Sequence, residues 1–349
     1  MFRKRWWKGE SSAAPGLSLA LQGGGAHGAY TWGVLDRLLE DGWALEGISG
    51  TSAGAMNAVA LAQGWTTGGA EGARESLSAF WEAVADSAPR ELDLLHSLNP
   101  AGMGSLPGPM SMMLGLTHLF SPYEFNPYEL NPLRDVVRAQ FDFERLRRDC
   151  PLKLFIAATT VRTGKVRLFH TAELSEAALL ASACLPTLHH AVEIDGEHYW
   201  DGGFTANPAI YPLLYECTAP DILMVLLNPL QRDDAPRSAE DISARSMELG
   251  FSTTFLREMR MIAHARQYIA ETAGWMPLGR LERKLVGQRF HLIEARELAE
   301  AGSTSKLNAA SGFLTELHTL GRSRADEWLR KQYRHVGRKE TVDVARLFL

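Results

Sequence analysis

Three short glycine-rich motifs hold the residues of this chain that could do chemistry. One of them, GTSAG at residues 50–54, places Ser52 in the spacing GxSxG between an expected strand and an expected helix. Small neighbours permit the sharp turn that projects a nucleophilic serine, and the start of a helix puts positive partial charge near its oxygen. We therefore predict that Ser52 is a nucleophile and that Gly50 and Gly54 are needed for the turn. A plain turn is the weaker alternative.

A second motif, GGGAHG at residues 23–28, follows an expected strand. Consecutive glycines allow backbone N–H groups to converge at the start of a helix and bind an anion or an oxyanion. The motif also contains the GxGxxG spacing of dinucleotide-binding folds, with Glu46 near the offset of a ribose-binding acid. Glu46 precedes the end of its strand, whereas the ribose acid normally lies at the C-terminal end. This position disfavours a dinucleotide site.

The third motif, DGG at residues 201–203, supplies a carboxylate that could act as the base for a serine nucleophile. An ordinary aspartate has a pKa near about 3.9 and is a weak base, but partial burial of Asp201 against Trp200 and Phe204 would raise its pKa. Taken alone, Asp-Gly-Gly is a common turn. No downstream histidine stands in a context that completes a triad; those weighed are His189, His190, His198, His264, His291, His318 and His335.

The expected strands and helices indicate how these motifs would be positioned. Apolar runs alternate with helical patterns over roughly the first 230 residues, which predicts an α/β fold with a mostly parallel central sheet and helices on both faces. Strands are expected at 17–21, 45–48, 152–160, 166–170, 192–194, 198–200, 221–227 and 290–293, and helices at 30–39, 53–63, 73–85, 133–141, 175–182, 239–272 and 307–332. A basic and aromatic tail (1–16), a catalytic domain (17–230) and a mainly helical extension packed on it (231–349) are the expected regions.

The composition of the chain excludes several classes of protein. Its 349 residues are 46% hydrophobic and 22% charged, and 36 Lys and Arg stand against 41 Asp and Glu, for a net charge of −5. This charge argues against nucleic acid as the main partner. The composition also differs from that of disordered, collagen-like or disulfide-rich chains. No metal-binding spacing is present in the sequence, so neither a metal nor another cofactor is expected.

Several features bear on location. No apolar run reaches the roughly 18 residues of a membrane span, and no apolar segment follows the basic N-terminus as it would in a secretory signal. The three widely spaced cysteines form no disulfide framework. We expect a cytoplasmic protein, with peripheral contact at the inner face of the membrane as an addition to be tested.

Two segments could contact lipid. The N-terminal tail combines cations with tryptophans suited to an anionic membrane surface, and a solvated terminus is an equal alternative. The residues concerned are Arg3, Lys4, Arg5, Trp6, Trp7 and Lys8. Residues 103–120, rich in Met and broken by Gly and Pro, would suit a movable lid over an acyl groove, although a helix packed on the core is slightly favoured.

Taken in order, the GGGAHG, GTSAG and DGG motifs resemble those of the patatin-like phospholipases. The similarity covers about residues 17–228, including SACLP at 182–186, and the region from about 231 matches no motif of the family. The resemblance implies a patatin-like α/β/α fold and a lipid acyl hydrolase that cleaves fatty-acid esters through an acyl-enzyme intermediate. An inactive lipid-binding protein of the same fold is the alternative, which the presence of Ser52 and Asp201 disfavours.

The resemblance also assigns roles to the motif residues. Ser52 would be the nucleophile of a Ser–Asp dyad and Asp201 its general base. The oxyanion hole would be formed by N–H groups of Gly23, Gly24, Gly25 and Ala26, chiefly the last three. Residues that support the motifs are Gly28, Gly50, Gly54, Gly202 and Gly203; the aspartate motif of the family ends in Gly or Ala, so Gly203 is no departure.

Overall fold

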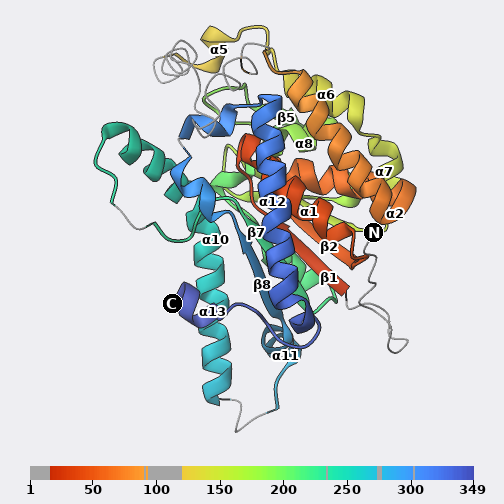
Figure 1. Cartoon of the computed structure of the whole chain (residues 1–349). Coiled ribbons are helices and arrows are strands. Elements are labelled where there is room, and N and C mark those ends of the chain that lie inside the picture. Colours follow the sequence, from red (N-terminus) through yellow and green to blue (C-terminus); the bar gives the residue numbers. More distant parts are fainter. Residues whose placement is uncertain (1–15, 90–91, 93–119, 233–234, 273–276, 302) are drawn as a thin grey trace.

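A mixed sheet of eight strands forms the centre of the computed structural model, which describes residues 16–89, 92, 120–232, 235–272, 277–301 and 303–349 (Figure 1). The strands are β1 (Gly16–Leu21), β2 (Ala44–Thr51), β3 (Lys153–Thr160), β4 (Val166–His170), β5 (Val192–Ile194), β6 (Glu197–Asp201), β7 (Asp221–Leu226) and β8 (Arg289–Glu294). Their order is β5-β6-β3-β2-β1-β7-β8, and β4 also pairs with β3. The pairs β3–β2, β2–β1, β1–β7 and β7–β8 are parallel. The pairs β3–β4, β3–β6 and β5–β6 are antiparallel. The predicted mostly parallel sheet is confirmed.

Helices cover both faces of this sheet. One face packs against α1 (Gly28–Leu39), α2 (Ala53–Asp86), α6 (Pro132–Gln140), α7 (Phe143–Asp149), α8 (Glu176–Ser182) and α12 (Ser311–Gln332). The other packs against α9 (Tyr211–Glu216), α10 (Ala239–Thr272), α11 (Arg280–Gly287) and α13 (Val344–Phe348). Alternate residues of β7, such as Leu223 and Met224, enter the two separate cores. Burial on both faces explains the continuous apolar runs of the sequence.

The region after residue 231 is joined closely to the rest of the chain. Its strand β8 pairs in parallel with β7 and so extends the same sheet. Its helix α12 crosses α1 at two glycines: a Cβ on Gly33 would lie 2.0 Å from the carbonyl oxygen of His318, and one on Gly321 would lie 2.0 Å from that of Tyr30. Figure 1 shows α12 crossing in front of the sheet beside α1. Close backbone contact at these positions excludes any larger residue.

Most predicted elements are present within one or two residues, and the differences have local causes. The helices expected at 53–63 and 73–85 form one element, α2, which is broken by non-helical backbone at Gly68 and Gly69. The last long helix begins at Ser311, because residues Ser303–Leu307 form a separate 3₁₀ helix, η6. The short helices α7, α9, α11 and α13 were not predicted. Elements of five to eight residues show too few turns for a periodic apolar pattern.

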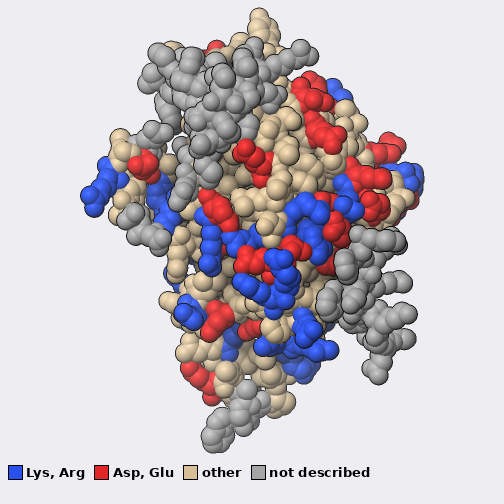
Figure 2. Space-filling view, in the orientation of Figure 1, with Lys and Arg blue, Asp and Glu red and all other residues tan. Residues whose placement is uncertain are grey.

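The segments that could contact lipid fall largely outside the described residues. These segments are the basic tail with its tryptophans and the expected lid at 103–120. Of the expected lid only Phe120 is described, and its side chain is half exposed. Within the described ranges, no helix combines the length and the hydrophobicity needed to cross a membrane. Figure 2 shows Lys and Arg intermixed with Asp and Glu over the middle of the face that α12 crosses.

Candidate active site

Ser52 and Asp201 lie where two strands end against each other. β2 runs parallel to β3, and its last residue, Thr51, pairs with Ala157. β6 runs antiparallel to β3, and its last residue, Asp201, pairs with Ala158. β4 pairs with residues 155–159 of β3, a stretch that overlaps both the β2 pairing and the β6 pairing. Because a strand has only two edges, β2 and β6 lie one after the other on the edge of β3 that faces away from β4. Successive positions along a strand are about 3.3 Å apart, so Asp201 lies beside the residue that follows Thr51, which is Ser52.

The backbone at Ser52 makes a strained turn between β2 and α2. Its φ of 54° and ψ of −121° are rare for a residue with a side chain. A Cβ on Gly50 would lie 2.6 Å from the carbonyl oxygen of Gly54, and one on Gly54 would lie 2.2 Å from that of Leu21. The Ser52 N–H donates to the Oγ of Ser182, 3.0 Å away, at the end of α8. The predicted turn is therefore present and requires both glycines.

Asp201 is enclosed by backbone on several sides. Its side chain accepts a hydrogen bond of 2.7 Å from the Gly203 N–H, and its own N–H donates to the carbonyl oxygen of Cys184 at 2.8 Å. Its carbonyl oxygen accepts from the Thr159 hydroxyl at 2.8 Å. Burial raises the pKa of the Asp201 carboxyl to about 7, while the Gly203 N–H and the Ser52 hydroxyl oppose that rise. A carboxyl with this pKa can accept a proton near neutral pH.

The aromatic cover of Asp201 differs from the one predicted. Trp200 precedes Asp201 in β6 and therefore points to the opposite face of the strand. The Phe204 side chain is 42% exposed. A ring that was not predicted, Phe251 of α10, packs on Gly203: a Cβ on Gly203 would lie 2.0 Å from the Cδ1 of Phe251 and 3.0 Å from the Oδ1 of Asp201. Nothing in the sequence near the DGG motif indicates this contact, because Phe251 belongs to a distant helix.

The glycine motif lies beside the Ser52 turn. A Cβ on Gly23 would lie 2.8 Å from the Cβ of Ser52. The next residues enter a 3₁₀ helix, η1 (Gly25–His27), which leads into α1. The first N–H groups of a helix have no partner inside it, so a helix start close to Ser52 offers backbone donors in this region. An anion site at this helix start stays a prediction.

Gly23 itself has another role. Its N–H donates a 2.7 Å hydrogen bond to the Oδ1 of Asn207, a side chain that is 2% exposed. The backbone carbonyl of Asn207 accepts from the side chain of Gln22, whose Oε1 accepts the N–H groups of Leu227 and Asn228 at 2.7 and 2.8 Å. Gly23 is therefore committed to holding the loop, which removes it from the predicted set of oxyanion donors.

Sequence reasoning missed three residues that hold the site: Ser182, Asn207 and Phe251. Ser182 opens the SACLP segment and Asn207 follows the DGG motif, so a small polar residue within or next to such a motif is the only signal available. Their hydrogen bonds connect segments far apart in the chain, so the partners could not be read from local sequence.

The histidine of the glycine motif is held neutral. His27 is buried, its pKa is lowered to about 3 by that burial together with the charge of Lys306, and its Nε2 lies 2.7 Å from the Oγ of Ser305 in η6. Another histidine, His291, contacts Asp221 and Thr341 at 2.9 and 3.0 Å. Asp221 is the first residue of β7, so this group lies at the opposite end of the sheet from the residues that follow β2.

The alternative of a dinucleotide site is contradicted by the position of Glu46. Its carboxylate lies near the start of β2 and accepts the N–H groups of Thr218 and Ala219. It also pairs with Lys153 at 2.9 Å. The glycine loop follows the opposite ends of these parallel strands, so Glu46 cannot reach a ligand bound there.

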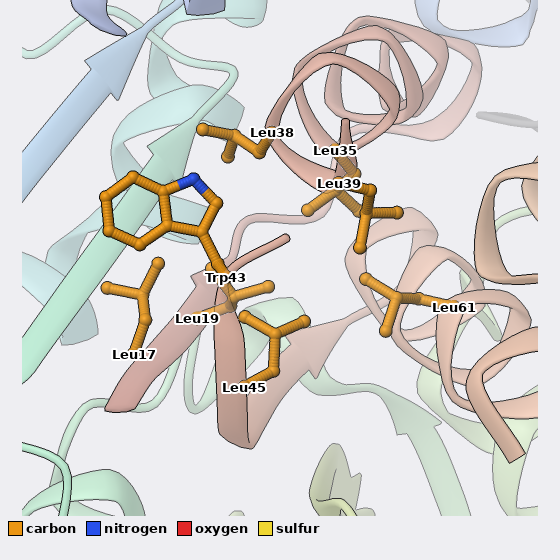
Figure 3. A pocket seen from close by; sticks show the side chains of 8 residues that line it. All are labelled: Leu17, Leu19, Leu35, Leu38, Leu39, Trp43, Leu45 and Leu61. Atoms are coloured by element: carbon orange, nitrogen blue, oxygen red, sulfur yellow. The ribbon is translucent and has the colours of Figure 1, made fainter. Parts of the chain in front are cut away.

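A small apolar cavity lies in the core between α1, α2 and the beginnings of β1 and β2 (Figure 3). Eight residues line it: Leu17, Leu19, Leu35, Leu38, Leu39, Trp43, Leu45 and Leu61. It has no catalytic or ligating group, so we assign it to core packing. Across the described ranges, no cluster of three His, Cys, Asp or Glu side chains is arranged to hold a metal ion.

Comparison with known proteins identifies the family. Residues 19–214, which include all three glycine motifs, match the family model described as patatin-like phospholipase. The chain belongs to the patatin-like phospholipase family. Ser52 and Asp201 both lie inside the matched patatin-like region, whereas Phe251 and η6 lie beyond it.

Solved structures give more distant matches to this patatin-like chain. VipD from Legionella pneumophila is 17% identical, with a TM-score of 0.38, over 90% of this chain and 68% of that one. Two structures of ExoU with SpcU, from the type III secretion system of Pseudomonas aeruginosa, are each 16% identical over 96% of this chain. They cover 76% and 74% of those chains with TM-scores of 0.27 and 0.29. No curated protein matches the sequence.

Proposed function

We propose that this protein hydrolyses carboxylic esters of fatty acids in lipids, with Ser52 as nucleophile and Asp201 as general base. The observation that carries the proposal is the meeting of β2 and β6 on one edge of β3, which places a strained serine beside a buried carboxyl of raised pKa. Membership of the patatin-like phospholipase family supports lipid esters as the substrate class.

The reaction would proceed in two steps. The Oγ of Ser52 attacks the ester carbonyl carbon while the Asp201 carboxylate accepts the hydroxyl proton. The carbon–oxygen bond to the alcohol then breaks, the alcohol leaves with that proton, and the fatty acid remains as an ester of Ser52. Water attacks this acyl-enzyme, again giving its proton to Asp201, and the fatty acid is released as Ser52 is restored.

Negative charge develops on the carbonyl oxygen in both steps. In this proposal the N–H groups of Gly24, Gly25 and Ala26 stabilise that charge. Donors fixed in place before the reaction are effective because they need no reorganisation, and removing one commonly costs about 100–1,000-fold in turnover. The Gly23–Asn207 hydrogen bond supports this role by fixing the loop next to Ser52.

The other regions of the chain fit the same proposal. Residues 17–230 would form the catalytic unit, and residues 231–349 a mainly helical extension that completes it. The basic tail would make peripheral contact with anionic lipid at the inner face of the membrane of a cytoplasmic protein. No cofactor takes part in the proposed reaction.

The test is active-site labelling combined with product analysis. We expect a fluorophosphonate probe to modify the wild-type protein at Ser52, located by mass spectrometry, and we expect fatty acid to be released from at least one lipid class. Ser246→Ala changes an exposed serine of α10 and is the matched control, which should keep both labelling and fatty-acid release. Labelling at another residue would overturn the assignment of Ser52. No labelling and no release from any lipid would favour the inactive lipid-binding alternative.

A further inference from the structure

The C-terminal helix α10 reaches the Asp201 carboxyl through one side chain. The ring of Phe251 packs on Gly203 so tightly that a Cβ there would lie 2.0 Å from Cδ1 and 2.3 Å from Cε1. The same point lies 3.0 Å from the Oδ1 of Asp201, so the ring lies within about 5 Å of that carboxyl oxygen. On its other side Phe251 contacts the ring of Phe204, with centroids 4.8 Å apart.

We propose that Phe251 is a positioning residue that shields the Asp201 carboxyl from water and thereby sets the pH range in which the dyad works. This inference rests on the proposed function, since it requires Asp201 to be the base. It also gives the extension a part in catalysis, because Phe251 lies outside the region that matches the family.

The position of Phe251 is fixed by the packing of α10. Phe255 and Met259 follow it at helical spacing and are buried against the sheet, at 1% and 0% exposed. Glu258 accepts the N–H of Ile210 at 3.1 Å, and also that of Tyr211, at the start of α9. These contacts hold α10, and with it the backbone of Phe251, against the segment that follows the DGG motif.

Charged neighbours do not provide an alternative control of Asp201. Among the described residues, the Gly203 N–H and the Ser52 hydroxyl lower the pKa of its carboxyl, and the Cys184 thiol is a titratable group that its charge affects. Burial raises the pKa of that thiol to about 12, so Cys184 stays neutral.

On α10, Glu248 pairs with Arg232 and Arg245 at 2.9 and 3.1 Å, and Glu258 is bound to α9. On β6 and β5, Glu197 pairs with Arg162 and Glu193 lies 3.9 Å from His198. Access of water is therefore the variable that Phe251 controls.

The experiment compares pH profiles of kcat/KM for a soluble ester. In the wild type, activity should fall on the acid side as Asp201 becomes protonated. In Phe251→Ala, water reaches the carboxylate and stabilises its charge, so the acid limb should move to lower pH by about one unit. Phe251→Leu, which keeps an apolar cover, should retain the wild-type limb, and Phe251→Val should fall between them even if Phe251→Ala does not fold.

Controls separate this inference from the proposed function. Met261→Ala truncates an exposed apolar residue of the same helix, 67% exposed, and should move neither the stability nor the limb. An unchanged limb in folded Phe251→Ala or Phe251→Val, or a change confined to KM, would overturn the inference. If Asp201→Asn retained activity, the proposed dyad itself would be wrong. If Asp201→Asn is inactive but the acid limb of folded Phe251→Ala does not move, only the proposed role of Phe251 is wrong.

Discussion

Thr51 and Asp201 pair with successive residues, Ala157 and Ala158, on one edge of β3. β2 and β6 run toward each other along that edge and both end there. Two motifs that are far apart in the sequence therefore meet head to head, and the residue after Thr51 comes to lie beside the carboxyl of Asp201. This arrangement is the basis of the predictions that follow.

Loss of either member of the dyad should abolish hydrolysis. We expect Ser52→Ala and Asp201→Asn each to lower kcat/KM by at least about 1,000-fold, because the two residues act as one unit. Circular dichroism should show an unchanged fold. Asp241→Asn, which alters an exposed aspartate of α10, serves as the control and should keep full activity. Substantial turnover by either purified dyad variant would refute the mechanism.

The stability of the protein should depend on pH through Asp201. Because its pKa is raised to about 7 in the folded state, the folded protein binds the proton more tightly than the unfolded chain does. This contribution to stability is fully present below about pH 4 and is lost as the pH rises through about 7. Asp201→Asn does not titrate, so it should gain stability relative to the wild type over this range, on the order of 2–4 kcal/mol. Urea unfolding at pH 4.5 and pH 8 measures the difference, and an equal gap at both values would contradict the buried-acid assignment.

The Asn207 side chain should matter for turnover more than for binding. Asn207→Ala leaves the buried Gly23 N–H without its partner, which should cost about 1–3 kcal/mol of stability and loosen the glycine loop. We expect kcat to fall about 10- to 100-fold with KM nearly unchanged. Asn131→Ala removes the N-cap of α6 at a similar cost in stability, about 1 kcal/mol, and should leave kcat intact. Equal effects of the two variants on kcat would show that Asn207 acts through general stability alone.

Two glycines with similar positive φ angles should respond differently to alanine. Gly25 and Gly42 have φ of 58° and 68°, so both substitutions introduce backbone strain of about 1 kcal/mol. At Gly25 the new Cβ would also lie 2.2 Å from the carbonyl oxygen of Lys306, whereas at Gly42 it meets nothing within 4 Å. Gly25→Ala should therefore lose most activity and more stability, and Gly42→Ala only a little stability. Thermal unfolding and ester hydrolysis of both variants provide the comparison.

The N-terminal tail should affect membrane binding without affecting chemistry. Deleting residues 1–10 removes the cations and tryptophans, so sedimentation with anionic liposomes should fall while turnover of a soluble ester stays the same. Neutral liposomes are the control, since they lack the surface charge. Unchanged sedimentation with anionic liposomes would assign no membrane role to the tail.

The sequence alone determined the local features of this protein. Strand–turn–helix patterns around GGGAHG and GTSAG predict the Ser52 turn and a helix start beside it, because small residues at fixed spacing permit only a few backbone conformations. The alternation of apolar runs and helices likewise predicts the mostly parallel sheet, since each strand buries both faces.

Only the tertiary structure decided which distant groups complete the site. The same run of glycines leaves open which N–H groups already have a partner, and the structure shows that the Gly23 N–H is bound by Asn207. The DGG motif likewise suggested aromatic cover of Asp201 from its own neighbours, yet a ring from a distant helix, Phe251, packs on Gly203 beside it. Local sequence sets backbone conformation through short-range sterics, whereas such contacts depend on how whole elements pack and are therefore visible only in three dimensions.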